Sequence, residues 1–403
     1  MIKKISVNQL RPGMYVSDLN CDWIPHHQYN REGRIPDDNT IAEIRRRGIT
    51  EVYIDTERGD GAQTEGLTAQ EVDHHNQQAL DKAAEMPADN SARVSVEEEL
   101  QRAHTVHTEA QNMVNNVLHN VKLGRAIDIE PFDQIADGMV DSVLRNHNAL
   151  ACLGRIRDKD NYLLEHSINL AVLMGIFAKS LNIDRTTMQD AIVGAMLHDI
   201  GKVMIPDAIL HKPGKLTDDE FAVIKNHVVF SRDLLKKSPG ISQLTINVAA
   251  QHHERIDGSG YPDGLHDCDI CREGKMCAIA DVYDAITADR VYHKGIPPTA
   301  ALKKLLEWSG THLDKALVHR FIRSMGIFPV GSLVELKSQR LGIVMDGAEK
   351  DQRMPIIKVI YSNRLKQYVP IETIDLSRPG VQDEVVKAVD PLRFGIRIKD
   401  FIL

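Results

Sequence analysis

The chain contains few aromatic residues, few cysteines and no long apolar run. Aromatic residues make up 5% of its 403 residues, so the hydrophobic core must consist mainly of Leu, Ile, Val, Ala and Met. The five cysteines are an odd number in a long chain, which argues against a disulfide framework and predicts a reducing, cytoplasmic location. No stretch approaches the roughly 18 uncharged apolar residues of a membrane span, and residues 1–16 lack the apolar run of a signal peptide.

Positive charge is also not in excess. The chain has 49 Lys and Arg residues against 57 Asp and Glu residues, which gives a net charge of −8 and argues against a general nucleic-acid binder. A small anionic ligand is compatible with this balance, because metal ions and a few local cations can hold phosphates. A hydrophobic content of 42% with 26% charged residues is typical of a globular protein, and the length predicts two or three domains.

The pattern of apolar residues divides the chain into five segments. In chain order we expect a small α+β module, a polar linker, a connecting helix, a run of consecutive helices and a β-rich segment: residues 1–56, 57–94, 95–126, 127–326 and 327–403. The predicted fold class is therefore mainly α, with a helical bundle as its core. Strands are expected at 14–16, 52–54, 333–336, 342–345, 356–361 and 368–371, and helices at 40–47, 161–181, 187–199, 217–237, 242–253 and 275–289.

The connecting helix carries a regular apolar stripe. Ser95 is a good helix cap with Glu98 three residues later, and apolar residues from Leu100 to Val121 recur at alternating spacings of three and four. This spans about three heptads, the lower limit for a coiled coil. We favour an amphipathic helix packed on its own domain, and a seam in a homodimer is the alternative.

Histidine and aspartate residues are concentrated at the ends and on the faces of the predicted helices of the core. Two dyads each end an apolar helix, and three further residues lie on other helices: His198-Asp199, His252-His253, His166, His227 and Asp281. Imidazole and carboxylate are the usual ligands of divalent transition metals. A carboxylate that bridges two metals, with imidazoles on either side, forms a dinuclear hydrolytic centre that activates water and clamps a phosphoryl group. A single histidine on an apolar face is usually a packing residue, but the ordered set favours a metal site.

These residues lie in motifs that resemble the HD superfamily of metal-dependent phosphohydrolases, and specifically its HD-GYP branch. The resemblance covers about half the chain, residues 127–326, and implies an HD-type helical bundle. The matching pieces are Glu165-His166-Ser167, His198-Asp199-Ile200-Gly201-Lys202, His227, His252-His253-Glu254, Asp257-Gly258-Ser259-Gly260-Tyr261-Pro262 and Asp281-Val282-Tyr283-Asp284-Ala285. Residues 1–55 look like the uncharacterised module that often precedes this domain.

The resemblance implies an activity and a cofactor. HD-GYP domains are bacterial phosphodiesterases that linearise cyclic di-GMP to pGpG and often on to GMP. By analogy, one metal is held by His166, His198, Asp199 and Asp281, and the second by Asp199, His227, His252 and His253. Tyr162 stands where some members have a glutamate that recruits a third metal, so two divalent ions are expected. The ligand types suit iron, manganese, zinc and nickel, and iron or manganese is favoured.

The same resemblance assigns residues to the substrate. Asp199 and Lys202 are expected to be catalytic, with the Lys202 ammonium meeting a phosphate oxygen. Arg290 matches an arginine that contacts phosphate or guanine, and a bidentate guanidinium suits either target. Lys294 lies near the same rim, and Tyr261 lines the ligand site or a partner surface.

Two other functions and one other metal site compete with this interpretation. The chain could be an HD phosphohydrolase of another nucleotide, or a cyclic di-GMP receptor or scaffold that docks a diguanylate cyclase. Cys268 and Cys271 have the spacing of half a zinc site, but Cys277 stands alone, so free thiols are favoured.

Overall fold

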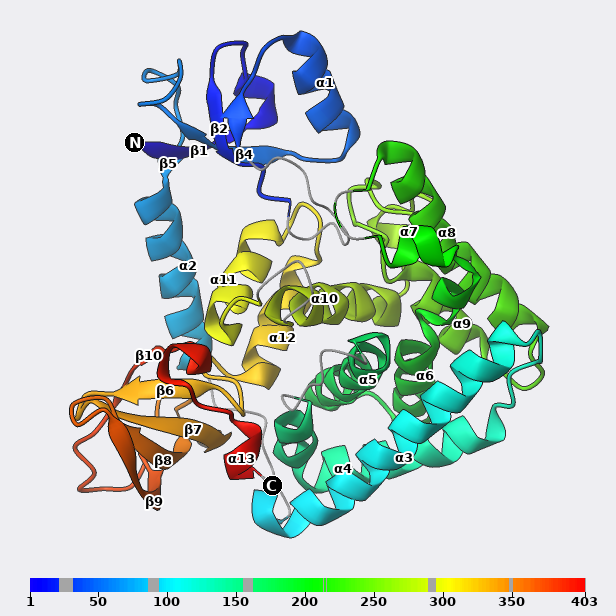
Figure 1. The fold of residues 1–403 in the computed structure, drawn as a ribbon, viewed down its shortest axis with the longest axis vertical. Helices are drawn as coiled ribbons and strands as arrows, with labels where there is room; N and C mark the ends of the chain where they lie inside the picture. The colour runs from blue at the N-terminus through cyan, green and yellow to red at the C-terminus, as the bar shows by residue number, and fades with distance from the viewer. Residues whose placement is uncertain are drawn as a thin grey trace.

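The computed structural model describes residues 1–21, 32–85, 94–154, 162–212, 214, 216–288, 295–347 and 351–402 (Figure 1). A helical bundle forms its body, with one small sheet near each end of the chain. The predicted mainly α fold class is therefore confirmed. None of the described helices combines the length and the apolar character that a membrane crossing requires.

The N-terminal sheet is antiparallel and is ordered β3-β2-β4-β1-β5 in the described residues. Its strands are β1 (Ile2–Ser6), β2 (Tyr15–Asp18), β3 (Gly33–Arg34), β4 (Glu51–Asp55) and β5 (Leu67–Thr68), and its helix is α1 (Asp38–Arg46). Asp37 caps α1 by accepting a hydrogen bond from the backbone of Thr40. The two strands and the helix expected in this module are present, whereas β1, β3 and β5 were not expected.

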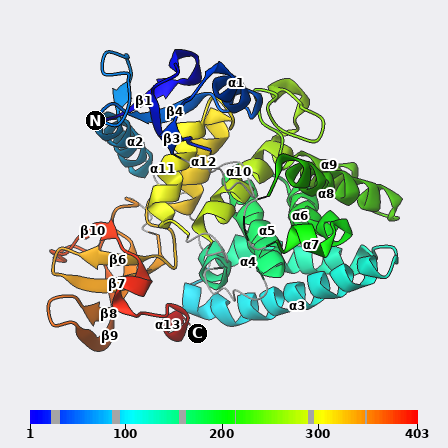
Figure 2. The same cartoon turned by 45° about the horizontal axis from the view of Figure 1, so that its top comes forward.

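Part of the predicted linker is a helix. Residues 57–94 are polar, but α2 (Ala69–Ala84) lies within them, started by a capping box between Thr68 and Glu71. Val72, Leu80 and Ala83 are buried at helical spacing, and α2 packs against α11 (Pro298–Trp308) and α12 (Lys315–Met325) (Figure 2). The prediction of a polar linker over residues 57–94 is therefore wrong for this stretch, because three or four apolar residues on one face are enough to dock a helix.

The long helix α3 (Val96–Lys122) packs along α4 (Glu130–Leu153) within the same chain. Its capping box joins Ser95 and Glu98 as expected. The stripe residues Ala103, His107, Ala110, Val114, Val117 and Val121 are buried, and Leu100 is partly buried. The preferred prediction, an amphipathic helix on its own domain, agrees with this packing.

The bundle surrounds the central helix α5, which is apolar over nearly its whole surface, as a fully surrounded helix must be. It comprises α4 (Glu130–Leu153), α5 (Tyr162–Ser180), α6 (Arg185–Leu197), η3 (Ile200–Met204), α7 (Asp207–Leu210), α8 (Asp218–Lys237), α9 (Gln243–Gln251), η4 (Asp267–Asp269), α10 (Arg272–Thr287), α11 (Pro298–Trp308) and α12 (Lys315–Met325). Helix α5 contacts α4, α6, α10 and α12, and α9 contacts α6, α8 and α10. The helices expected from the sequence agree with α5, α6, α8, α9 and α10 to within a few residues.

The C-terminal sheet is antiparallel and is ordered β10-β6-β7-β8-β9 in the described residues (Figure 1). Its strands are β6 (Leu333–Leu336), β7 (Arg340–Asp346), β8 (Ile356–Ser362), β9 (Gln367–Asp375) and β10 (Val385–Ala388), followed by η5 (Pro391–Phe394) and α13 (Lys399–Ile402). The four strands expected here are present, and β10 is an addition. Asn148 of α4 donates a hydrogen bond to Asp346, 2.6 Å away, which joins the sheet to the bundle.

Candidate metal centre

Six elements of the bundle bring the seven predicted ligand residues to one buried place. His166 comes from α5, His198 ends α6, Asp199 begins η3, His227 comes from α8, His252 ends α9 with His253 next, and Asp281 comes from α10. All seven side chains are buried. Within this set, the ligand atoms of His227, His252 and His253 lie within 4.8 Å of one another, as do those of His166, His198 and Asp199.

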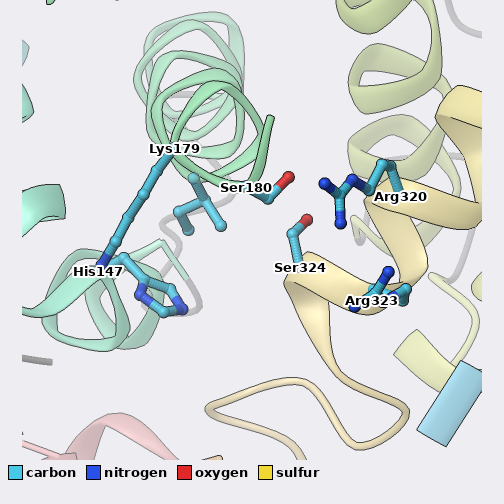
Figure 3. Close-up of a pocket in the computed structure, with 7 residues that line it drawn as sticks. His147, Lys179, Ser180, Arg320, Arg323 and Ser324 are labelled. Carbon is cyan, nitrogen blue, oxygen red and sulfur yellow. The ribbon is translucent and has the colours of Figure 1, made fainter. Parts of the chain in front are cut away.

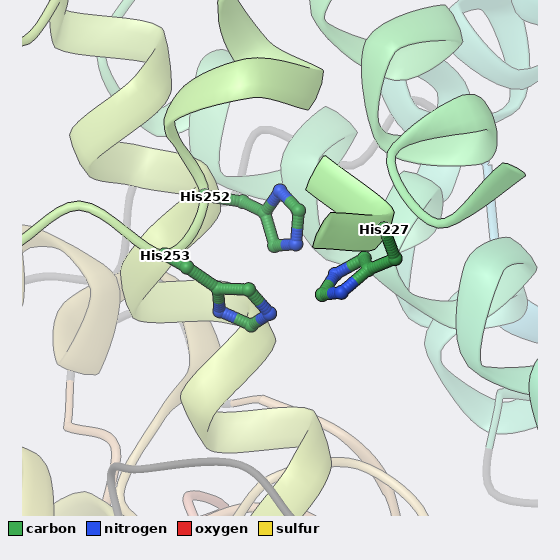
Figure 4. A group of neighbouring side chains, drawn as sticks. All are labelled: His227, His252 and His253. Carbon is green, nitrogen blue, oxygen red and sulfur yellow. The ribbon is translucent and has the colours of Figure 1, made fainter. Parts of the chain in front are cut away.

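Three of the imidazoles are oriented by the helices that carry them. The Nδ1 atoms of His198, His227 and His252 each lie 2.7 Å from the backbone carbonyl three residues earlier. A carbonyl only accepts, so each Nδ1 carries the proton and each Nε2 presents a lone pair to the cavity. Figure 4 shows the rings of His227, His252 and His253 pointing toward a common space.

A carboxylate orients the fourth imidazole. His166 Nδ1 lies 2.8 Å from Asp284 Oδ2, and Asn169 donates to the other oxygen of the same carboxylate. Asp284 is fully buried, one helical turn beyond Asp281 on α10. A carboxylate behind a histidine fixes the ring and makes the opposite nitrogen a better ligand.

Asp199 lies between the two groups of ligands. Its Oδ2 is 3.1 Å from His198 Nε2, and its Oδ1 is 3.2 Å from His227 Nε2. Asp281 also reaches both sides, with Oδ1 3.1 Å from His166 Nε2 and Oδ2 3.5 Å from His253 Nδ1. Each carboxylate can therefore offer one oxygen to each side.

The protonation states suit a cation site. Burial acts to raise the pKa of Asp199, but its electrostatic interactions with the neighbouring His198 and Lys202 outweigh burial and hold that pKa well below its usual range. Burial, followed by repulsion between neighbouring imidazoles, lowers the pKa of His252 and His253 well below the usual value. The carboxylate is thus ionised and these two rings are neutral, which is the state that metal binding requires.

His166 behaves differently. Burial acts to lower its pKa, but hydrogen bonds to Asp281 and Asp284 outweigh burial and raise the pKa to about 9. Without a metal, a proton on this ring therefore supplies the positive charge that the two carboxylates attract.

Several buried atoms of the cluster have no hydrogen-bond partner. Within the described residues these are Asp199 Oδ1, His227 Nε2, His252 Nε2 and His253 Nδ1. Leaving such atoms unpaired in the interior costs about 1–3 kcal/mol each. The lone pairs of His227 Nε2 and Asp199 Oδ1 moreover face each other, which is unfavourable unless a cation lies between them. The residues present therefore fit divalent metal ions.

Lys202 and Gly201 complete the edge of this site. The buried Lys202 ammonium donates to Asp199 Oδ2. A Cβ at Gly201 would lie 2.1 Å from the backbone oxygen of His227 and 2.5 Å from the backbone nitrogen of Ser231, so only glycine allows η3 to pack this closely on α8. The Gly201 amide donates to the Ser231 hydroxyl, 2.9 Å away.

The loop after His253 brings Tyr261 against the cluster. The ring centroids of Tyr261 and His253 are 4.8 Å apart, and burial raises the Tyr261 pKa well above its usual value. Glu254 holds this loop by accepting backbone hydrogen bonds from Asp263 and Leu265, at 2.8 and 2.9 Å. A Cβ at Gly260 would lie 2.4 Å from the backbone nitrogen of Arg255, so the loop closes tightly here.

Two predicted substrate contacts, Arg290 and Lys294, lie outside the described residues.

Two functional residues were missed from the sequence: Asp284, which orients His166, and Glu254, which fixes the loop. The spacing of three between Asp281 and Asp284 on one helix was a usable signal, because such residues share a face. Nothing in the sequence indicated that the Glu254 carboxylate accepts hydrogen bonds from the backbone of the loop. Of the three cysteines considered for zinc, Cys271 caps α10 by accepting from the amide of Gly274.

Two family models match the chain. A domain of unknown function (DUF3391) matches residues 2–132, and an HD domain matches residues 152–317. The HD match contains all seven residues of the buried cluster.

Curated relatives match over very different lengths. The chain is 36% identical over 392 residues to a cyclic di-GMP phosphodiesterase of Pseudomonas aeruginosa, covering 96% of this chain and 92% of the relative. It is 40% identical over 199 residues to a probable cyclic di-GMP phosphodiesterase of Vibrio cholerae, covering 46% of this chain and 44% of the relative. It is 44% identical over 123 residues to a 3′3′-cGAMP-specific phosphodiesterase of Vibrio cholerae, covering 30% of this chain and 24% of the relative.

Proposed function

Because the chain belongs to the HD-GYP family of HD-domain, metal-dependent phosphodiesterases, we propose that it hydrolyses a phosphodiester bond of cyclic di-GMP, giving pGpG and, by a second cleavage, GMP. The family expected from the motifs is confirmed by the nearly full-length relative. The observation that carries the activity is the buried cluster, to which six elements contribute. Four of its ligand atoms, from η3, α8 and the end of α9, have no hydrogen-bond partner among the described residues.

The cluster supports two divalent metal ions, with iron or manganese favoured. One would be held by His166, His198, Asp199 and Asp281, and the other by Asp199, His227, His252 and His253. Bound there, such ions would neutralise charge on the phosphoryl oxygens and supply an activated water at neutral pH.

The protein's own groups hold this arrangement in place. The helix carbonyls behind His198, His227 and His252 and the Asp284 carboxylate behind His166 keep the ligand nitrogens turned inward before a metal arrives. Asp199 would serve both ions at once, since its oxygens face the two groups separately. Lys202 would leave Asp199 Oδ2 to a metal and turn its ammonium to a phosphate oxygen.

Substrate binding is proposed for three further residues. Tyr261 supplies a partly buried ring beside His253, suited to line the ligand site. Arg290 and Lys294 follow α10, the helix that carries Asp281, and would add positive charge toward a phosphate or guanine.

A specific comparison favours a second substrate. Two relatives named as 3′3′-cGAMP-specific phosphodiesterases are 44% and 33% identical to this chain, over 123 and 184 residues. A substrate panel that compares kcat/KM for cyclic di-GMP and for 3′3′-cGAMP distinguishes the two substrates.

The alternative of a receptor or scaffold that docks a diguanylate cyclase requires binding of cyclic di-GMP without hydrolysis. The cytoplasmic location and the homodimer stay predictions from the sequence.

The experiment is anaerobic turnover of cyclic di-GMP, followed by chromatography, on protein whose bound metals have been counted and identified. About two metals per chain and the appearance of pGpG or GMP are expected. Asp199→Ala should lose both metal and turnover, while Asp233→Ala, an exposed carboxylate on α8, should lose neither. Full turnover by Asp199→Ala, or a metal-free wild type that is active, would reject the proposed centre.

A further inference from the structure

Two hollows that the clustered metal ligands do not line differ greatly in size. One lies between α4, α5 and α12, beside His147, Lys179 and Arg320 (Figure 3), and at about 10 Å³ it has room for no more than a water molecule. The other lies between the segment that leads into α11 and the C-terminal sheet, and it holds about 480 Å³. This volume is within the range of ligand pockets, so the larger cavity is the candidate for a second binding site.

Apolar side chains from two separate parts of the chain line the larger cavity. Ile296 and Pro297 belong to the segment that leads into α11. Val389 and Phe394 follow β10, at the end of the C-terminal sheet. All four are partly buried, and the Phe394 ring packs against Tyr361 of β8, with ring centroids 5.9 Å apart. The cavity can therefore cover the apolar body of a small ligand from both parts of the chain.

The acidic groups of this cavity are already engaged within the C-terminal part. The Glu335 carboxylate accepts a hydrogen bond from the Asn363 amide, 2.8 Å away, and its other oxygen lies 3.3 Å from the Lys387 ammonium. The Asp390 carboxylate accepts from the backbone of Leu392, 3.0 Å away, and so caps η5. A ligand therefore does not have to supply a cation for either carboxylate.

The basic groups of the cavity, by contrast, have donors to spare. The Arg393 guanidinium forms neither a hydrogen bond nor an ion pair with the described residues. The Lys387 ammonium has three donors and only Glu335 as its partner in the described part of the chain. Both basic side chains are exposed, whereas the apolar side chains are partly buried. An anionic group at Arg393 and Lys387 would thus keep part of its hydration, which limits the cost of binding it.

We propose that this cavity binds a mononucleotide, with its base among the apolar side chains and its phosphate at the two basic residues. The Arg393 guanidinium offers paired donors that match phosphate oxygens, and Lys387 adds a second positive charge. The Asn363 amide donates to Glu335 through its nitrogen, so its carbonyl oxygen is suited to accept from the edge of a base. The site is separate from the metal centre and does not depend on the hydrolysis of cyclic di-GMP.

The test is photoaffinity labelling of the metal-loaded full chain with an azido analogue of GMP, followed by mass spectrometry of the peptides. Since each label is located by its peptide, nucleotide bound at the metal centre is counted separately. We expect label within residues 295–297 or 387–394 that excess GMP competes away. Arg393→Gln should reduce this label at least tenfold. Arg11→Gln, at an exposed arginine of the N-terminal module, is the matched control and should label as the wild type does.

Two further variants cover the case in which Arg393→Gln does not fold. Lys387→Gln changes a side chain that is 63% exposed, so the fold should be kept while the label decreases. Ala388→Trp fills the cavity from β10 and should abolish the label without removing a charge. Label found only in the peptides of the metal centre, or equal cavity label in the wild type and all three pocket variants, overturns the proposal. Turnover is not part of this readout, so failure here is distinct from failure of the proposed activity.

Discussion

Single atoms decide how the metal centre is prepared. Four imidazoles each use Nδ1 on a fixed acceptor, three on helix carbonyls and one on Asp284. The opposite nitrogen is thereby held toward the cavity, so little rotamer freedom is left to lose when a metal binds. Unlike the backbone carbonyls, Asp284 also carries a charge. A substitution at Asp284 can therefore test the effect of losing this charge by itself.

Asp284→Asn keeps the size of the side chain but removes the charge behind His166. We expect metal affinity to fall about 10–100-fold, because the ring loses both its fixed tautomer and its electrostatic support. Competition against a chelator of known affinity measures the change. Asp233→Asn, on the exposed face of α8, is the matched control. Equal affinities in the two variants would show that Asp284 does not support His166.

Gly201→Ala tests the packing of η3 on α8. The added methyl group would meet the backbone of His227 and Ser231, which cannot move without shifting the helix that carries a ligand. We expect a loss of about 1–3 kcal/mol in the free energy of unfolding, in the range of overpacked cores. Urea denaturation measures it. Gly33→Ala, where a methyl group meets nothing within 4 Å, should change stability little, and similar losses at both positions would contradict the packing argument.

At the scale of elements, α3 was predicted from its apolar stripe, yet one member of that stripe is a histidine. His107 is 7% exposed, and burial, with a smaller contribution from His104, lowers its pKa to about 4. In the unfolded chain its pKa is about 6.5. The unfolded state therefore binds the proton more readily between these values, and folding stability falls as the pH decreases through that window.

Protonation of His107 should lower the free energy of unfolding by up to about 3 kcal/mol between pH 7 and pH 4. This value follows from the difference between the pKa values of His107 in the folded and unfolded states. His107→Leu should weaken this part of the pH dependence, since leucine does not titrate. Urea denaturation at pH 7 and pH 5 gives the comparison with wild type. His119→Leu, exposed on the same helix, should leave the wild-type slope unchanged. An unaltered slope in His107→Leu would assign the acid sensitivity to other groups.

At the scale of the whole molecule, the N-terminal module is joined to the bundle by buried polar contacts. The indole nitrogen of Trp308 on α11 donates to Asn20, 3.0 Å away, and the Tyr53 hydroxyl donates to Glu307, 2.7 Å away. Helix α11 leads on to His312, which lies 3.1 Å from Asp257 at the start of the loop that carries Tyr261. The module, α11 and this loop therefore form one continuous set of contacts.

Tyr53→Phe removes the hydrogen bond to Glu307 while keeping the ring. A hydrogen bond to a charged, buried partner contributes about 1.5–3 kcal/mol, so the free energy of unfolding should fall by that amount. Chemical denaturation followed by fluorescence measures it. Tyr368→Phe, at a residue 53% exposed on β9, should be neutral within about 0.5 kcal/mol. A neutral Tyr53→Phe would show that this contact does not hold the module.

The local sequence pattern was enough to predict the candidate metal ligands and the main helices of the bundle. The types of the seven clustered residues, their order along the chain and the helix-period apolar residues around them were all readable, because each depends on local pattern. The polar stretch that forms α2 was misjudged, because its few apolar residues matter only once α11 and α12 are beside them.

Only the packing of the helices shows which ring nitrogens face the cavity, that Asp284 lies behind His166, and that Gly201 packs against the backbone of α8. It also gathered His147, Lys179 and Arg320 from three helices around one hollow. These facts depend on how helices distant in sequence converge. Periodicity fixes which face of each helix is buried, but the positions of neighbouring helices fix what each buried face meets.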